Sequence, residues 1–553
     1  MTVPSYAQEL AIAVAKTGCT HVFGLMGDGN MQLFVALRRQ GVHVVEVRHE
    51  SAAVAMAEGY GWSCDQVGIC SVTHGPGLSH VATSLLVAAR NRSPLVVIAA
   101  ETPAGYQGAQ TFDQQSFAEA CETRYRRMTQ GERPAQALAD AIESARDVSG
   151  PVILGVAADL LASTVDDSPA PGEPPAPTPG PPGLDDGAAA ERLTQLIAGS
   201  ARPVLIAGRG ATGGRSVGLL RTLAEHVGAG LATTLPAKGL FDGHHLDLGI
   251  AGGLAHPAAE RVLRSADLVV GIGATMGRST TQSMRLFADA QVVTVVSDAR
   301  GVAGVEPLLG DAVRTLEHTT ALARVATEPR EPWFHPVGPA AQCWAEDLRE
   351  FAPPIPDGTV DPRRAVARIS EHIPDDANVV ISNGHCSGFA AAFVTAPARG
   401  RFFAAQGFGS IGQALPTAIG VALGAPGRKT VVFEGDAAFM MHAQELDTAA
   451  RAGADLTVFV LNDQALGTEY QRLHLEGSDA GAAVVPTPGL AALAGALGAR
   501  ATTIDTDTAY AHAEAALRPG LAFVDVRTAR SVLSRHLRLP YRRVDPPQQV
   551  RSS

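Results

Sequence analysis

The 553-residue sequence predicts an α/β protein with three doubly wound parallel-sheet domains. Short apolar runs alternate with helical stretches along most of the chain, and two proline-containing stretches interrupt this alternation. Apolar runs that alternate with helices are typical of parallel sheets, whose strands are buried on both faces. The length also exceeds what a single hydrophobic core usually serves, so several domains are expected.

Residues 1–165 form the first predicted domain. The stretch 166–183 follows it and is Pro-rich; because proline sustains neither a helix nor a central strand, this stretch is expected to be a semi-rigid linker. The expected strands of the first domain are the apolar runs His21 to Leu25, Val42 to Val47, Val67 to Val72 and Pro94 to Ala100.

Residues 184–326 form the second predicted domain, the central one. Its expected strands are Pro203 to Gly208, Asp267 to Gly273 and Val292 to Asp298. Two short glycine patterns, Gly208 to Gly210 and Gly271 to Gly273, follow strands and resemble nucleotide-binding loops. A tight turn between a strand and a helix is the better explanation of such short patterns.

Residues 327–358 carry several prolines without a clear period and are expected to be a second linker. The third predicted domain, residues 359–530, repeats the alternation of strands and helices. The tail, residues 531–553, is rich in Arg and Pro and is expected to be irregular or draped over another subunit.

Composition excludes several classes of function. The net charge of −11 argues against nucleic-acid binding. The six cysteines include no CxxC pair, so neither a disulfide framework nor a zinc site is expected. No apolar run reaches the length of about 18 residues that spans a membrane. The N-terminus lacks the pattern of a signal peptide, so a cytoplasmic protein is expected.

The stretch from Val431 to Tyr470 carries the strongest functional signal. An apolar run ends in Gly435-Asp436, a helical segment follows, and a second apolar run ends in Asn462-Asp463. Because ligands of parallel sheets bind beyond the carboxyl ends of the strands, both carboxylates are expected at one crevice. Carboxylate oxygens beside a tight turn suit Mg²⁺ that holds a diphosphate. The simpler alternative is an ordinary strand–helix–strand unit with solvated carboxylates.

This stretch resembles the cofactor motif of thiamine diphosphate (ThDP) enzymes, in which Gly-Asp-Gly is followed after a fixed gap by two Asn. The resemblance implies that the metal ligands are Asp436, Asp463 and the main-chain carbonyl of Ala465, with the usual spacing of 463 − 436 = 27. The sequence departs from the motif at Ala437, where the family has Gly, and at Asp463, where it has Asn. Three α/β blocks also match the pyrimidine-binding, central and diphosphate-binding domains of ThDP-dependent decarboxylases and acetolactate synthases.

Glu50 lies at the expected end of a strand and start of a helix, after Arg48-His49. In the family, a glutamate at this point hydrogen-bonds N1′ of the cofactor's pyrimidine, which lets the 4′-nitrogen take the proton from C2 of the thiazolium. That chemistry needs a carboxyl group in a water-poor site, and Val45, Val47 and Ala52 supply apolar neighbours. The alternative is a first-turn charge that the helix dipole favours.

His74 lies in Thr73-His74-Gly75-Pro76-Gly77, which resembles the family's Gly-Pro-Gly loop near the pyrimidine ring. Acetolactate synthases usually carry a small residue at this position. His74 is expected to donate a proton or to contact a substrate carboxylate; the alternative is a loop histidine bonded to the backbone.

Asp28 lies in a second Gly-Asp-Gly, but the position 27 residues further on is Ala55, which offers no side-chain oxygen to a metal. This loop resembles that of pyruvate and indolepyruvate decarboxylases, so Asp28 is expected to handle protons; the alternative is an N-cap for the helix near Asn30. The segment Gln107 to Gln115 resembles the Phe-Gln loop of acetolactate synthases and benzaldehyde lyases. That resemblance places Phe112, Asp113 and Gln114 at the site.

Two further loops of the third block match the family. Ser382 to Ser387 aligns with the segment that holds the diphosphate, where a helix N-terminus presents free N–H groups to an anion. Gly407 to Gly412 matches a loop whose bulky apolar side chain bends the cofactor, and Ile411 is that side chain here. The cofactor-binding residues implied by the resemblance are Glu50, Gly384, His385, Cys386, Gly409, Ile411, Gly435, Asp436, Ala437, Ala438, Asp463, Gly467 and Thr468.

Two departures narrow the subclass. Arg472 aligns with a Trp of acetolactate synthases, and Thr275 aligns with an Arg that touches FAD and substrate there. Both count against an ordinary acetolactate synthase, and FAD is not expected. Arg472 suits an anionic substrate or acceptor, or it is a solvated residue of a surface helix.

The resemblance implies a ThDP- and Mg²⁺-dependent enzyme that decarboxylates a small-molecule 2-oxo acid and transfers the acyl-anion equivalent to a carbonyl acceptor. Its site lies between subunits in the family, so a homodimer or homotetramer is expected. Two alternatives stay open: a simple decarboxylase or C–C lyase, and a non-catalytic scaffold of the same fold. Neither nucleic acid nor membrane is an expected partner.

Overall fold

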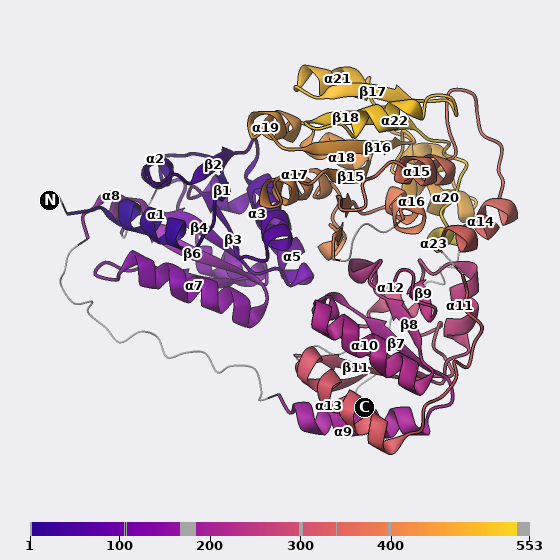
Figure 1. Cartoon of the computed structure of the whole chain (residues 1–553). Helices are drawn as coiled ribbons and strands as arrows, with labels where there is room; N and C mark the ends of the chain where they lie inside the picture. The colour runs from indigo at the N-terminus through magenta and orange to yellow at the C-terminus, as the bar shows by residue number, and fades with distance from the viewer. Residues whose placement is uncertain are drawn as a thin grey trace, which may run out of the picture.

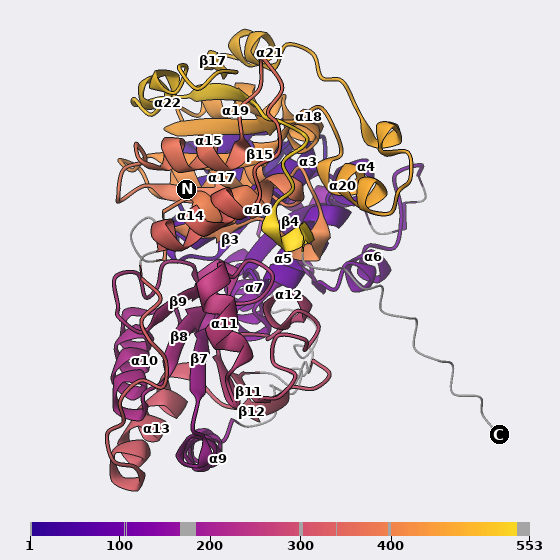
Figure 2. The ribbon, with the colours of Figure 1, turned by 90° about the vertical axis from the view of Figure 1, so that its right-hand side faces the viewer.

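The computed structural model describes residues 3–103, 105, 106, 108–165, 184–297, 302–338, 340–395 and 400–538. They form three α/β domains, each built on a six-stranded parallel sheet, as the sequence predicts (Figures 1 and 2).

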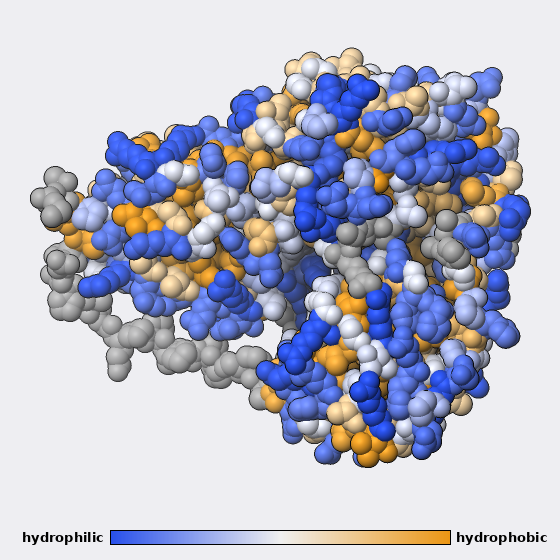
Figure 3. All heavy atoms as spheres, in the orientation of Figure 1, coloured by the Kyte–Doolittle hydropathy of each residue, from blue (hydrophilic) through white to orange (hydrophobic). Residues whose placement is uncertain are grey.

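No helix of this described part is both long and apolar enough to cross a membrane. Hydrophilic residues cover much of the face in Figure 3, with apolar residues in smaller groups between them.

The first domain has the strand order β2-β1-β3-β4-β6-β5. Its elements are α1 (Tyr6–Lys16), β1 (His21–Gly24), α2 (Met31–Arg39), β2 (His43–Glu46), α3 (Glu50–Cys64), β3 (Gly68–Val72), α4 (Pro76–Ser79), α5 (Ala82–Asn91), β4 (Leu95–Glu101), α6 (Gln114–Ala120), β5 (Arg124–Arg127), α7 (Pro134–Val148), β6 (Pro151–Ala157) and α8 (Ala158–Ala162).

The central domain has the order β12-β11-β10-β7-β8-β9, which read from the other edge is that of a dinucleotide-binding fold. Its elements are α9 (Asp186–Gly199), β7 (Pro203–Ala207), η1 (Arg209–Ala211), α10 (Gly214–Val227), β8 (Gly230–Thr233), η2 (Leu235–Ala237), β9 (Asp247–Ile250), α11 (Pro257–Arg264), β10 (Leu268–Ile272), α12 (Arg278–Thr281), β11 (Gln291–Val296), β12 (Glu306–Leu309) and α13 (Ala312–Ala326).

The third domain has the order β14-β13-β15-β16-β18-β17, the same pattern of crossovers as in the first domain. Its elements, with the preceding α14 (Ala340–Glu350), are α15 (Pro362–Ser370), β13 (Asn378–Ile381), α16 (His385–Phe393), β14 (Phe402–Ala404), η3 (Gly407–Gly409), α17 (Ala414–Gly424), β15 (Thr430–Gly435), α18 (Asp436–His442), α19 (Glu445–Arg451), β16 (Leu456–Asn462), α20 (Gly467–Leu475), η4 (Ala480–Ala483), α21 (Leu490–Ala496), β17 (Arg500–Ile504), α22 (Ala511–Ala516), β18 (Ala522–Arg527) and α23 (Arg535–Arg538).

Several elements were not predicted. The strand list omitted β5 and β6 in the first domain and β8, β9 and β12 in the central one. β5 reads Arg-Tyr-Arg-Arg and lies at a sheet edge, so it has no apolar run to reveal it. The predicted linker 166–183 lies outside the described residues.

The segment 327–358, expected to be a linker, contains helix α14. Tertiary packing stabilises this helix, because Trp344 is buried against Phe393 of the third domain with ring centroids 5.3 Å apart. The start of the tail is also ordered on its own chain. Arg535 of α23 pairs with Glu260 of the central domain at 2.7 Å, and the backbone N–H of Ser534 donates to His385. Residues 539–553 lie outside the described part.

Helices α3 and α17 join the first domain to the third (Figure 1). Residues Glu50 to Tyr60 of α3 and Ala414 to Leu423 of α17 are all buried, as expected of helices with apolar residues on most of their faces. The two backbones approach closely at two glycines. A Cβ on Gly420 would lie 1.9 Å from the Met56 carbonyl oxygen, and one on Gly59 would lie 2.0 Å from that of Thr417.

This approach predicts the effect of one methyl group. Gly420→Ala should destabilise the protein by about 1–3 kcal/mol, because the new Cβ meets backbone that cannot move aside. Gly218→Ala is the control: Gly218 lies within α10, and a Cβ there would meet open space among the described residues, so this change should stabilise the helix by about 0.5–1 kcal/mol. Thermal and urea unfolding of both variants measures the difference; equal melting temperatures would contradict the close packing.

Candidate active site

A pocket of about 610 Å³ lies at the carboxyl end of the third sheet. Strands β15 and β16 pair in parallel, with Gly435 opposite Leu461, so Asp436 and Asp463 follow neighbouring strand ends. Every third-domain residue that the sequence proposed for cofactor or metal lines this pocket: Gly384, His385, Cys386, Gly409, Ile411, Gly435, Asp436, Ala437, Ala438, Asp463, Ala465, Gly467 and Thr468.

The two aspartates give this pocket two acidic side chains. Asp436 is the first residue of α18, and burial, followed by the nearby charge of Asp463, raises its pKa to about 7. Its Oδ2 is buried without a hydrogen-bond partner among the described residues. Asp463 Oδ1 accepts from the backbone N–H of Ala465 at 3.1 Å, and its Oδ2 lies 3.7 Å from His385 Nδ1. A buried carboxylate oxygen without a donor is suited to a cation.

The loop that carries Asp463 is anchored by hydrogen bonds with neighbouring segments. Gln464 has φ of 55°, a conformation that few residues other than glycine adopt. Arg530 donates through Nε to the carbonyl oxygen of Asp463 at 2.8 Å, and Asn462 donates to Asp525 Oδ1, also at 2.8 Å. The position of the second carboxylate is therefore set by the end of β18 as well as by β16.

Two helix N-termini border the same pocket. α16 begins at His385, after Gly384 with φ of 94°, and α20 begins at Gly467. A Cβ on Gly467 would lie 2.8 Å from Asp463 Oδ2, so a larger residue here would have to displace the Asp463 side chain. Free N–H groups at helix N-termini attract anions such as phosphate groups. The pocket thus combines features that suit a cation with features that suit an anion.

Ile411 lies at the rim of the pocket, three residues before α17 begins. It follows the short helix η3, in which Phe408 has φ of 59°. A side chain that is placed by such a strained turn and left half-buried is available to contact a bound molecule.

Glu50 lies in the first domain and does not line this pocket. It is the first residue of α3, its side chain is buried, and its Oε2 is 2.9 Å from His80 Nδ1. His80 was missed in the sequence; the available signal was its position three residues after Gly77, in the loop that faces Glu50. A Cβ on Gly77 would lie 3.8 Å from Glu50 Oε1.

Asp28 and His74 lie together in the first domain, with Asp28 Oδ1 and His74 Nε2 3.7 Å apart. His74 is buried; its Nε2 also bonds Gln110 at 2.8 Å, and its Nδ1 lacks a partner within the described structure. The N-cap interpretation of Asp28 is wrong, because α2 begins after Asn30 and Asp28 instead accepts from Thr73 Oγ1 at 3.3 Å.

Gln114 is buried at the start of α6 and donates through Nε2 to the carbonyl oxygen of Ala100 at 2.9 Å. Asp113 accepts from the backbone N–H of Ser116 at 3.0 Å and thereby caps the helix. The segment thus positions a buried amide near the end of β4. Gln107, at its start, lies outside the described residues.

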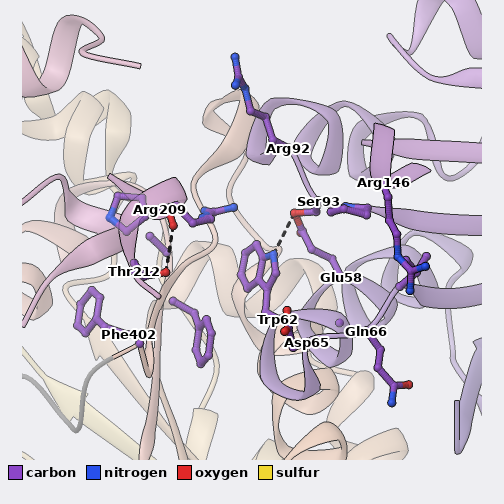
Figure 4. Close-up of a pocket in the computed structure, with 17 residues that line it drawn as sticks. Glu58, Trp62, Asp65, Gln66, Arg92, Ser93, Arg146, Arg209, Thr212 and Phe402 are labelled. Carbon is purple, nitrogen blue, oxygen red and sulfur yellow. Dashed lines mark hydrogen bonds between the residues drawn. The ribbon is translucent and has the colours of Figure 1, made fainter. Parts of the chain in front are cut away.

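A second cavity, of about 390 Å³, lies where the three domains meet (Figure 4). The guanidinium carbon of Arg209 lies 5.0 Å from the ring centroid of Trp62, and Arg209 donates to the carbonyl oxygen of Asn91 at 2.6 Å. Trp62 Nε1 in turn donates to Ser93 at 3.0 Å. The labelled arginines point in different directions, and of these Arg209 is attracted by the buried Glu58.

Comparison with protein families agrees with this geometry. Residues 5–121 match the N-terminal TPP binding domain of thiamine pyrophosphate enzymes, residues 190–319 match the central domain, and residues 382–526 match the C-terminal TPP binding domain. The chain belongs to the thiamine pyrophosphate enzyme family. Thiamine pyrophosphate is ThDP, so the chain is a ThDP-dependent enzyme, and the scaffold alternative is not supported.

Similar proteins from other organisms place the chain among acetolactate synthase-like enzymes of this family. The acetolactate synthase large subunit of Corynebacterium glutamicum is 28% identical over 85% of this chain and 77% of its own length. The acetolactate synthase of Mycobacterium avium is 27% identical, over 89% and 82%. The sulfoacetaldehyde acetyltransferase of Castellaniella defragrans is 26% identical, over 89% and 87%.

The third-domain pocket fits the cofactor of this family. The unpartnered oxygen of Asp436 and the adjacent Asp463 suit a divalent cation, and the N-termini of α16 and α20 suit a diphosphate. Cys386 also lines the pocket, where burial raises the pKa of its thiol well above the usual range, so it packs as an uncharged group.

Asp463 provides a direct test of this metal site. Asp463→Asn should retain ThDP binding, because an amide oxygen replaces the carboxylate and one of two repelling charges is removed. Asp463→Ala should weaken ThDP binding about tenfold or more, since a ligand oxygen is lost. Calorimetric titration of ThDP at fixed Mg²⁺ measures both. If the alanine variant binds ThDP like the parent, Asp463 is not a metal ligand.

Proposed function

We propose that this enzyme uses ThDP and Mg²⁺ to decarboxylate a 2-oxo acid and to transfer the resulting acyl-anion equivalent to a carbonyl acceptor. The observation that carries the proposal is the third-domain pocket, in which two carboxylates face two helix N-termini. Arg472 also lines this pocket and supports an anionic substrate.

Each group of residues has a defined task in this proposal. Asp436, Asp463 and the carbonyl of Ala465 hold Mg²⁺, and the N-termini of α16 and α20 hold the diphosphate. When bound, ThDP supplies the nucleophilic carbon and stabilises the negative charge left after loss of CO₂. Glu50 shares a proton with the pyrimidine ring from a buried position, and Ile411 fixes the bend of the cofactor.

We propose that a second copy of the chain completes the site. The pocket is lined by residues of the third domain, and Glu50 lies elsewhere, against His80. We therefore place Glu50 of one copy against the pocket of another in a homodimer, which a homotetramer would contain twice.

A simple decarboxylase is the second candidate. Asp28 and the buried His74 form a pair that suits proton donation to the reacting carbon, which would release an aldehyde instead of a ligated product. The relatives named as a synthase and as an acetyltransferase favour group transfer. Products of single 2-oxo acids, with and without added carbonyl compounds, distinguish the two by mass spectrometry.

We also propose that the central domain works without FAD. Thr275 stands where the family's flavin-contacting Arg is expected. The strand order of this domain puts a dinucleotide crevice between β7 and β10. There the backbone N–H of Gly210 donates to the Gly273 carbonyl at 3.1 Å, and Arg209 extends to Trp62. This packing supports a crevice that the chain itself fills.

Glu50→Gln should leave the fold and ThDP binding nearly intact and lower activity by roughly 10²–10⁴-fold, because an amide cannot share a proton with N1′. The measurement is exchange of the C2 proton of bound ThDP with deuterated water, followed by NMR after acid quench. Exchange at the parent rate would remove Glu50 from this role.

Mixed dimers test the shared site. At a limiting ThDP concentration, Glu50→Gln and Asp463→Ala should each have little activity alone. Co-expressed with separate tags and purified through both, they should form mixed dimers that each contain one intact site and one doubly defective site, with up to about half of the parent's activity. If each site were built within one chain, the mixed dimers would remain inactive.

A further inference from the structure

The turn that carries Glu50 is held by the third domain of the same chain. Glu445 is the first residue of α19, and it is fully buried. Its Oε1 and Oε2 accept from the backbone N–H of Arg48 at 3.0 and 3.3 Å, and Thr448 Oγ1 donates to Oε2 at 2.7 Å. The carboxylate of Glu445 thus anchors the main chain two residues before Glu50.

Burying a carboxylate to hold a loop costs free energy, because the charged group loses its contact with water. Burial raises the pKa of Glu445 to about 7, and hydrogen bonds from Thr448 and from the backbone of Arg48 and His49 oppose this shift. Hydrogen bonds to a charged acceptor are stronger and more directional than neutral ones. Glu445 does not line the third-domain pocket, so its role lies in this contact.

The residue that follows Glu50 is held in the same way. Ser51 Oγ lies 3.0 Å from Nε2 of His442, a buried residue at the end of α18. The Glu50 carboxylate itself meets His80 at 2.9 Å. Third-domain side chains therefore hold the chain on both sides of Glu50, and a first-domain histidine orients its carboxylate.

Other contacts between the two domains are of a different kind. The side chain of Arg48 pairs with Asp447 at 2.7 Å, and both groups are partly exposed to solvent. Exposed pairs of this type contribute little to stability. Asp447 thus forms a surface ion pair between the domains. Glu445, two residues earlier in α19, instead accepts hydrogen bonds from the backbone next to Glu50.

We propose that Glu445 is a positioning residue that sets the place of Glu50 by anchoring the backbone of Arg48 and His49. This inference rests on the proposed role of Glu50 at the cofactor. Proton transfer needs heavy atoms within about 2.6–3.2 Å, and a displacement of about 1 Å can cost 10²-fold in rate. A neutral amide at position 445 would keep one acceptor oxygen but loosen this turn.

The test uses Glu445→Gln, the control Asp447→Asn, and Glu50→Gln alone and combined with Glu445→Gln. In the protein without ThDP, amide hydrogen exchange of the peptide that contains Arg48 and His49 should be several-fold faster in Glu445→Gln and unchanged in Asp447→Asn. With ThDP, Glu445→Gln should lower kcat and C2-proton exchange about tenfold with KM for the 2-oxo acid unchanged, and Asp447→Asn should match the parent.

The combined variant decides whether Glu445 acts through Glu50. In the Glu50→Gln background, Glu445→Gln should have little further effect, because the group that it positions no longer works. A further tenfold loss in the combined variant, or unchanged amide exchange at Arg48 and His49 in Glu445→Gln, would overturn the proposal. Failure of the proposed function appears separately, as parental C2-proton exchange in Glu50→Gln alone.

Discussion

The close contact of α3 with α17 is the constraint on which the site depends. These helices approach most closely at Gly59 and Gly420, where the absence of a side chain lets the backbone of one helix contact the backbone of the other. Glu50 begins α3, and the loop of Ile411 leads directly into α17. One crossing of two buried helices therefore places a first-domain acid and a third-domain apolar side chain. Both would be displaced by any change in the distance between these helices.

Buried carboxylates mark the places where this protein bears an electrostatic cost. Burial raises the pKa of Glu58, Glu434, Asp436 and Glu445 above the usual range. Glu58 accepts from Ser93 and Asn91, and Glu445 accepts from the backbone of Arg48. Glu434 and Asp436 each retain one oxygen without a donor in the described structure. Asp436, directly after β15, lines the pocket where the cation is proposed, whereas Glu434 does not line it.

The three sheets differ in strand order and in what their loops contribute. The first and third sheets share one strand order, and each carries its proposed site residues at the carboxyl ends of its strands. The central sheet has the order of a dinucleotide-binding fold, yet its first loop contributes Arg209 to the junction of the three domains. Sheet order alone thus does not assign a ligand, because the loops decide whether the crevice is open.

Local sequence determined the alternation of strands and helices, the three domains, and the spacing that brings Asp436 and Asp463 to neighbouring strand ends. These features depend on periodicity and on short-range geometry, which a single sequence records.

Helix α14 was not predicted, because packing of Trp344 on another domain stabilises it. His80 beside Glu50, Gln110 beside His74, and Glu445 on the backbone of Arg48 join residues 30, 36 and 397 positions apart. Only the tertiary structure decides such contacts, because they depend on how separate helices and loops pack, and no local pattern encodes that arrangement.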